Sequence, residues 1–234
     1  MDATSDPPNL SQEAIPEAPD PPFNGVIEVQ DDQGNLLAKM TYASGILDGL
    51  TEIFFPSGGT AQKLMYAQGL LSGEAFLYAE DGQMTHTLTY VDNVLNGPAA
   101  FYQGGAKTMD TLYVKGVQEG KTIYYTPQGT ISAEAFYKTG QLEGLFTFFG
   151  EQGNVIRTAS YHAGKLEGPS ITYYPNGQIL EEALYQANLL EGERHQYYDD
   201  GSLKEIAVFA EGKPQKSVQF DKKGNVLPPQ QGTA

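Results

Sequence analysis

The chain of 234 residues contains no cysteine and no tryptophan. Without cysteine it cannot form a disulfide scaffold, a thiolate zinc site, an iron–sulfur cluster or a cysteine nucleophile. Basic residues are also scarce, because 14 Lys and Arg stand against 29 Asp and Glu, a formal net charge of −15. Nucleic acids and anionic membranes bind to basic surfaces, so we expect neither as a direct ligand.

Long apolar runs are missing as well. No stretch approaches the roughly 18 apolar residues that a transmembrane helix needs. The first ten residues, MDATSDPPNL, lack the basic and apolar regions of a signal peptide. The chain as written therefore predicts a cytoplasmic protein, whereas removal of an export signal would leave the same sequence on a periplasmic or anchored one.

Proline and acidic residues gather at the amino terminus. Residues 1–23 hold six of the 14 prolines and five acidic residues, and the first basic residue is Lys39. Such a segment has too little apolar surface to offset the entropy lost on ordering. We predict a disordered acidic tail over residues 1–23.

Glycine is abundant, with 27 residues, and its spacing reveals a repeat. Eight glycines follow one another at intervals of 23 or 24 residues, and we number each repeat from them as position zero: Gly25, Gly49, Gly73, Gly97, Gly120, Gly144, Gly168 and Gly192. A repeat with this regularity predicts an array over residues 24–214. Residues 215–234 then form a partial capping repeat and a short tail.

Other positions of the repeat are also shared. Position five is aromatic in seven repeats, from Phe54 to Tyr197, and position seventeen is aromatic in all eight, from Tyr42 to Phe209. We expect these rings to stack between neighbouring repeats. Glycines mark a turn near position nine and a second turn near position twenty, where Asn93 and Asn188 replace glycine. Since Asn best tolerates positive φ among the other residues, the second turn is predicted to need left-handed backbone.

The segments between the turns are predicted to be strands. They are short, rich in Tyr, Phe, Ile, Thr and Val, and alternate with period two, as in residues 131–137. Each repeat then forms two antiparallel strands, and eight repeats give about sixteen. The predicted fold class is all-β, an elongated twisted antiparallel sheet of about eight stacked β-hairpins of about 24 residues each.

The stretches 168–192 and 192–213, together with YKTGQLEG (137–144) and YHAGKLEG (161–168), resemble MORN repeats, and most of all their bacterial variant form. The resemblance covers about residues 24–214. It implies a twisted ribbon of β-hairpins that acts as a protein-interaction scaffold. Some bacterial variants are named as antitoxins of toxin–antitoxin pairs, which is an analogy at the level of the fold.

No catalytic or metal site is expected. His86, His162 and His195 occupy different positions of the repeat, so stacking does not gather them as ligands. The acidic pairs Glu181–Glu182 and Asp199–Asp200 are interpreted as solvated charges. No nucleophile elbow or phosphate loop is present, and we predict a protein that is not an enzyme and holds no cofactor.

One set of side chains is better suited to binding. Many neighbours of the position-five aromatic are aromatic too, and alternation places them on the opposite face of the sheet. We take them as the candidate partner-binding face: Phe55, Phe101, Tyr124, Phe148, Tyr174 and Tyr198. Coiling of the sheet could instead cover both faces.

Three functions remain open from the sequence. The first is a non-enzymatic scaffold that binds a protein, basic if charge decides, through the ribbon face. The second is an antitoxin or immunity protein that masks a basic toxin. The third is a module that binds glycan or cell wall through its aromatic side chains, and the sheet edges also leave oligomerisation open.

Overall fold

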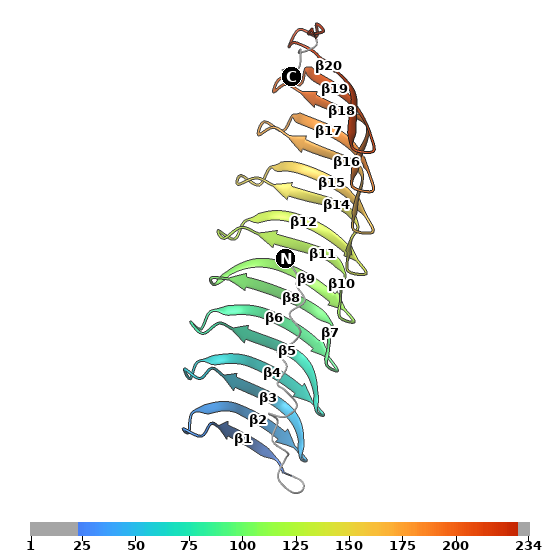
Figure 1. Cartoon of the computed structure of the whole chain (residues 1–234). Helices are drawn as coiled ribbons and strands as arrows, with labels where there is room; N and C mark the ends of the chain where they lie inside the picture. Colours follow the sequence, from blue (N-terminus) through green and yellow to red (C-terminus); the bar gives the residue numbers. More distant parts are fainter. Residues whose placement is uncertain (1–22, 229–234) are drawn as a thin grey trace. The chain divides into compact units, whose positions relative to one another are not determined.

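The structure is a computed structural model that describes residues 23–228. All of its regular elements are β-strands, twenty in number and antiparallel, and the described residues contain no helix (Figure 1). The predicted all-β class of stacked antiparallel hairpins is confirmed. The tail predicted for residues 1–23 lies outside the described residues except for Phe23, whose ring packs against Tyr42 at 6.3 Å between centroids.

The chain divides into two compact units. Within the described residues, unit 1 comprises residues 23–83 and 90–94, and unit 2 comprises residues 84–89 and 95–228. We describe each unit by itself. In both, the two strands of each hairpin pair side by side, and each hairpin pairs with the next along the chain, as predicted from the repeat.

Unit 1 contains two full hairpin repeats and the beginning of a third. Its strands are β1 (Gly25–Gln30), β2 (Leu36–Ala43), β3 (Ile46–Phe54), β4 (Thr60–Ala67) and β5 (Leu70–Tyr78). It also takes the end of β6 (Met84–Val91) and the start of β7 (Val94–Leu95). Ala38, Met40, Tyr42 and Leu47 form its buried cluster, and Tyr66 of the next repeat packs against them.

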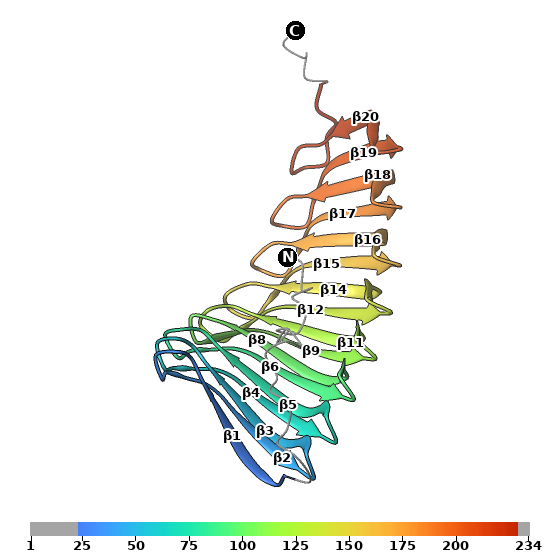
Figure 2. The ribbon, with the colours of Figure 1, turned by 60° about the horizontal axis from the view of Figure 1, so that its bottom comes forward.

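Unit 2 holds most of the array. Figure 2 shows its hairpins stacked in order, and we call each hairpin repeat a rung. Besides the first six residues of β6 and the last residue of β7, its strands are β8 (Gly97–Gln103), β9 (Ala106–Val114), β10 (Val117–Gln118), β11 (Gly120–Tyr125), β12 (Ile131–Lys138), β13 (Gln141–Leu142), β14 (Gly144–Phe149), β15 (Val155–His162), β16 (Lys165–Tyr173), β17 (Ile179–Gln186), β18 (Leu189–Tyr197), β19 (Leu203–Ala210) and β20 (Lys213–Gln219).

The count of twenty strands exceeds the predicted sixteen for two reasons. Three rungs are interrupted by one residue before position zero, at Asn96, Glu119 and Glu143. There the backbone N–H bonds back to the preceding strand, as from Glu143 to the Phe136 carbonyl at 2.9 Å. The partial last repeat supplies β20, which pairs with β19, and a turn closed by the Phe220–Val226 bridge.

The two faces of the sheet differ in the size of their side chains. Positions two and fifteen lie on one face, where Ala75, Ala135 and Ala159 are completely buried. We call this the alanine face, and position four and the position-seventeen tyrosines share it. Positions one and sixteen lie on the other, the leucine face, where Leu145 is 50% and Leu184 is 52% exposed.

A bulge near the first turn fixes how the strands end. Tyr124 pairs with Ala133, but Tyr125 pairs with Ile131, so Ser132 is the extra residue. The same shift follows position four in most of the other repeats, for example between Gln196 and Tyr197. Position five is consequently the last residue of its strand, and position six begins the turn, except in the repeat with the shortened first turn, where the strand continues to Gln103 at position six.

The glycine at position zero is required by both backbone and space. Gly97 has φ of 136°, a conformation that side chains rarely adopt. A Cβ atom there would lie 2.8 Å from the Cβ of Thr89, the position-sixteen residue of the preceding strand. In this repeat the position-sixteen residue covers the glycine of the next one, as Thr41 covers Gly49 and Met65 covers Gly73, whereas Gly144 and Gly192 have nothing within 4 Å.

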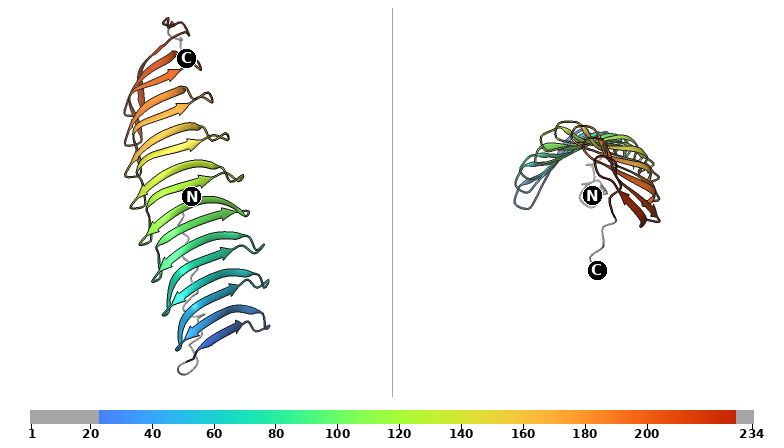
Figure 3. Two further views of the ribbon diagram at one scale, coloured as in Figure 1. Left: turned by 180° about the vertical axis from the view of Figure 1, so that it is seen from behind. Right: turned by 90° about the horizontal axis from the view of Figure 1, so that it is seen from above.

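The second turn has positive φ at its glycine or Asn position, as predicted, and at the residue before it, which was not predicted. Asn93 and Asn188, the two replacements for glycine, have φ of 66° and 73°. The residue before each also has positive φ, for example Ala187 at 50°, and this pair of conformations is typical of the tight type I′ turn. First and second turns lie at opposite ends of the strands, as Figure 3 shows for unit 2 in its left panel.

Candidate functional site

Much of the polar surface maintains the fold, beginning with the second turns. The glycine or Asn N–H at the tip of each turn donates to the carbonyl two residues before the position-zero glycine of the rung below. Examples are Gly164 to Leu142 and Gly212 to Leu190, at 2.9 and 3.0 Å. These bonds join successive turns along one edge of the sheet.

Acidic side chains cap the same turns. The residue just before position zero accepts the N–H of the first positive-φ residue in the next turn. Glu119, Glu143, Glu167 and Glu191 do this at 2.7 to 3.0 Å. Bonds to Glu143 from the Ala163 N–H and from His162 lower the pKa of this carboxyl group. Part of the acidity of the chain therefore belongs to the fold, and the Leu-Glu-Gly segments were its signal in the sequence.

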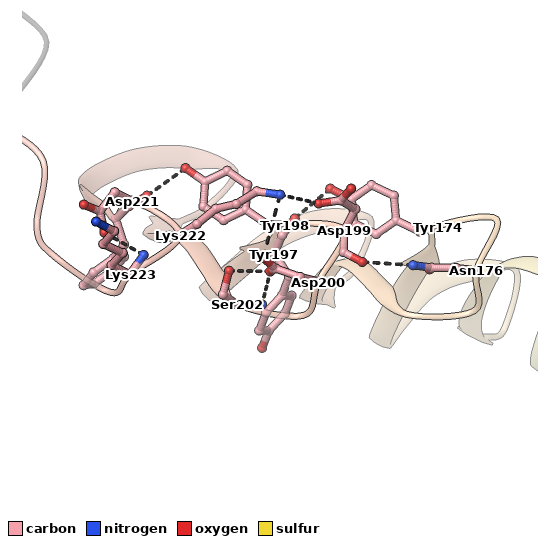
Figure 4. Close-up of polar contacts among 11 residues, drawn as sticks. Tyr174, Asn176, Tyr197, Tyr198, Asp199, Asp200, Ser202, Asp221, Lys222 and Lys223 are labelled. Carbon is pink, nitrogen blue, oxygen red and sulfur yellow. Dashed lines mark hydrogen bonds and ion pairs between the residues drawn. The ribbon is translucent and has the colours of Figure 1, made fainter.

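The first turns are joined differently near the end of unit 2 (Figure 4). Tyr174 and Tyr198, both at position six, donate their hydroxyl groups to the carbonyls of Tyr197 and Phe220 in the next rung, at 2.8 and 2.9 Å. Lys222 bonds Asp199 at 2.6 Å and lies over the Tyr198 ring. The pair Asp199–Asp200 is thus part of an ionic contact between turns.

The six candidate binding residues separate into two sets. Phe101, Tyr124 and Phe148 lie at position four, within strands and on the alanine face. Phe55, Tyr174 and Tyr198 lie at position six, just past the strand ends and in the first turns. All six are half-buried. They do not form one row, because the strand ends before position six.

Two residues of the position-four set, Tyr124 and Phe148, belong to an aromatic cluster of unit 2, whereas Phe101 packs against His86. The Phe146 ring stacks on Phe148 at 4.3 Å and on Tyr124 at 6.0 Å, and it meets Tyr161 at 6.0 Å. Tyr124 and Tyr137 share a hydrogen bond of 2.8 Å between hydroxyl groups. We call these residues the aromatic patch: Tyr124, Tyr137, Phe146, Phe148 and Tyr161.

Phe146 is the residue that the sequence analysis missed. It occupies position two, where the other repeats of unit 2 carry Ala99, Thr122, Ser170 and Arg194. A large ring stands here in place of a small side chain or a charged one. The signal in the sequence was this departure from the repeat at position two. It was missed because the candidate residues were chosen as neighbours of the position-five aromatic.

The aromatic patch is bounded by polar groups on the same face. On one side Gln118 donates to the hydroxyls of Thr111 and Thr122, at 3.0 and 2.9 Å. On the other side Arg157 lies over the Phe148 ring, 5.9 Å from its centroid. Burial raises the pKa of Tyr124, and the bond with Tyr137 raises it further. The hydroxyl of Tyr124 therefore stays protonated near neutral pH.

Beyond Arg157 the alanine face becomes charged. Arg194 pairs with Glu205 and lies over the Phe209 ring at 5.3 Å. Gln196 donates to Glu181 at 2.8 Å. Arg194 thus pairs with two carboxylates, Glu205 and, at 3.9 Å, Glu181, although its buried Nε makes no hydrogen bond.

A shallow groove of about 300 Å³ lies on the leucine face and is lined by Pro169, Ile171, Leu184, Glu182 and His195, among others. His195 lies 3.1 Å from Glu182 and 3.0 Å from Glu193. Tyr197 also donates to Glu182, and this bond lowers the pKa of the glutamate.

The three histidines have separate surroundings. His86 packs edge-on against Phe101 at 5.1 Å, and its burial lowers the pKa of the imidazole. His162 bonds Glu143 at 3.0 Å. Over residues 23–228 no group of three or more His, Cys, Asp or Glu side chains is arranged to hold a metal ion. That part of the chain also contains no helix suited to crossing a membrane.

Comparison with known families identifies part of the array. Residues 166–187 and 190–211 match the MORN repeat variant family. Each segment corresponds to one rung of unit 2, from the leucine before position zero through the second strand. The resemblance seen in the sequence is confirmed for these two repeats. No curated protein matches the chain.

Two of the solved structures that match the chain are distant from it. A point mutant of Staphylococcus aureus TarM, in complex with Fondaparinux, alpha-GlcNAc-glycerol and UDP, is 8% identical with a TM-score of 0.18. The match covers 67% of this chain, which spans 21% of that protein. Selenomethionine-substituted virginiamycin B lyase from Staphylococcus aureus is 9% identical with a TM-score of 0.16, over 89% of this chain and 86% of the lyase.

Proposed function

We propose that the protein is a non-enzymatic scaffold that binds a protein partner through the aromatic patch of unit 2. The observation that carries the proposal is Phe146, the one large aromatic side chain in a row of smaller or charged ones in that unit. Side chains that recur in every repeat are explained by the fold that the repeats share. A side chain that occurs at one repeat alone indicates a role specific to that repeat. The match to MORN repeats supports this, because such repeats generally act as interaction modules.

The geometry of the patch suits protein recognition. Its rings are held by stacking and by the Tyr124–Tyr137 hydrogen bond, so little side-chain entropy is lost on binding. Aromatic residues with an arginine at their edge, here Arg157, are the side chains most enriched at interaction hot spots. The described residues are all strands and turns, and none of them forms a second layer over this face.

Replacement of Phe146 by alanine tests the proposal. Alanine already stands at position two in other rungs, as Ala75 and Ala99, so the fold accommodates it. The matched control is Leu145→Ala, one residue away and on the opposite face. A partner captured by the wild-type chain and by Leu145→Ala, but lost with Phe146→Ala, supports the proposal. If both variants capture the same partners as the wild type, the aromatic patch is not the binding surface.

An antitoxin or immunity role is a narrower form of the same proposal. It requires a basic toxin as the partner. The net charge of the chain, −15, favours such a partner by charge complementarity. Binding that weakens steeply with salt distinguishes this role from a glycan-binding one, whose contacts through stacked rings survive high salt.

A further inference from the structure

The leucine face of unit 1 carries a second surface, distinct from the aromatic patch. Six large apolar side chains there are between 38% and 45% exposed: Ile46, Leu50, Met65, Leu70, Val91 and Val94. We infer that this unit-1 apolar surface is the docking site of a basic amphipathic helix of a protein partner.

The six side chains are neighbours in the fold. Leu50 pairs directly with Met65 across β3 and β4. Ile46 lies under the next second turn, where a Cβ on Gly69 would meet it at 3.3 Å, and Leu70 follows that glycine. Asn93, between Val91 and Val94, is bonded to Leu71 through both its N–H and its side chain. The apolar groups thus follow one edge of unit 1 from rung to rung.

The same row is broken in unit 2. Ile46, Leu70 and Val94 occupy the place three residues before position zero. In unit 2 this place is held in order by Val117, Gln141, Lys165, Leu189 and Lys213. Because the fold is the same in both units, the repeat itself does not require an apolar residue there.

Charge indicates the sign of the partner. The described residues of unit 1 include nine acidic side chains and two lysines, a net charge of −7. Both lysines are already paired, Lys39 with Glu28 at 3.0 Å and Lys63 with Glu52 at 3.2 Å. Unit 2 is far closer to balance, with 15 acidic and 12 basic residues in its described part. A partner that docks on unit 1 therefore approaches a unit with a surplus of negative charge, which favours a basic one.

Spacing indicates the shape of the partner. Neighbouring strands are about 4.8 Å apart, so equivalent residues of successive rungs are about 9.6 Å apart. Residues seven apart in an α-helix are separated by about 10.5 Å. A helix that lies across the strands can place one apolar residue per heptad against each of Ile46, Leu70 and Val94, with lysines or arginines on its flanks. An extended chain, whose like-facing residues repeat about every 6.7 Å, does not match this spacing.

Designed peptides test the inference without knowledge of the natural partner. The probe is a helical peptide of three heptads with leucine at heptad spacing and lysine on the flanks, labelled for fluorescence anisotropy. Comparison peptides replace lysine by glutamate or scramble the leucines. The full chain is used as wild type, as Leu50→Ser/Leu70→Ser, and as the control Leu145→Ser/Leu184→Ser, which changes exposed leucines of the same face in unit 2.

The inference predicts that the basic helix binds the wild type and the control with the same affinity within about twofold. The unit-1 pair should weaken it by about tenfold or more, because each leucine loses the burial gained on docking. Circular dichroism checks that both variants remain folded, and Phe146→Ala should leave peptide binding unchanged, which separates this surface from the aromatic patch. Absence of binding to the wild type, equal binding of the acidic or scrambled peptide, or equal losses in both variant pairs would overturn the inference.

Discussion

The stability that depends on glycine at position zero can be measured by replacing two of these glycines with alanine. Gly97 and Gly144 both have positive φ, of 136° and 76°. A Cβ at Gly97 would lie 2.8 Å from Thr89, which is itself held by a hydrogen bond to the Pro98 carbonyl. A Cβ at Gly144 has nothing within 4 Å. Both substitutions therefore strain the backbone, more so at Gly97, whose φ lies outside the left-handed region that alanine can reach, and Gly97→Ala adds a steric clash.

The magnitudes follow from these two terms. Positive φ destabilises the fold by about 1–2 kcal/mol when the residue is alanine. The lower conformational entropy of the unfolded chain offsets about 0.4–1 kcal/mol of this. Gly144→Ala should then destabilise by about 1 kcal/mol. Overpacking against Thr89 adds about 1–3 kcal/mol at Gly97, so Gly97→Ala should cost about 2–4 kcal/mol. For a chain of this size the difference of about 1–3 kcal/mol corresponds to a Tm lower by about 2–12 °C.

Thermal unfolding followed by circular dichroism compares the two variants with the wild type. Hydrogen exchange at the Asn96 amide, which donates to the Thr89 carbonyl at 2.8 Å, reports whether the damage is local. The expected result is a larger loss of Tm and of Asn96 protection in Gly97→Ala than in Gly144→Ala. Equal losses in the two variants would refute the view that position sixteen closes over the glycine.

Three further predictions concern the turns and the alanine face. Gly164→Asn should change the stability by less than about 0.5 kcal/mol, because Asn tolerates positive φ and already occupies this place as Asn93 and Asn188. Gly164→Val should cost at least about 1 kcal/mol. Similar melting temperatures of the two variants would contradict this. Because folding lowers the pKa of Glu143 from 4.5, its stabilisation is present above that pH and is lost as the pH falls through the lowered value. The acid-induced fall in Tm should accordingly be smaller in Glu143→Gln, and an unchanged fall would argue against the cap. Gln118→Leu alone should cost about 1 kcal/mol, whereas Gln118→Leu/Thr111→Ala/Thr122→Ala should be nearly neutral, because it removes the whole buried polar network; chemical denaturation that shows additive losses would disprove the coupling.

The architecture was predictable because its causes are local. Gly-rich turns, alternation and a fixed period each report the conformation of a few residues, and the φ values of Asn93 and Asn188 agree with them. The bulge was not predictable from alternation, since the extra residue, such as Ser132, resembles any other strand residue. That bulge ends the strand at position five and so places Tyr174 and Tyr198 in turns, apart from Tyr124 and Phe148.

The site was less accessible to sequence analysis than the fold. The stacking of Phe146 on Tyr124 and Phe148 depends on which strands lie side by side and which residues share a face. The capping by Glu167 or Glu191 joins residues 20 apart in the chain. Once the positions of the repeat are numbered, residues that depart from it, such as Phe146 and Gln118, indicate candidate functional positions.

Photo-crosslinking from adjacent residues tests the central claim most directly. A benzophenone amino acid placed at residue 146 projects from the alanine face, and the same group at residue 145 projects from the leucine face. The account predicts a covalent adduct with a single protein partner from residue 146 and none with that partner from residue 145. Equal adducts from both residues, or adducts from residue 145 alone, would contradict the claim that the aromatic patch is the binding surface.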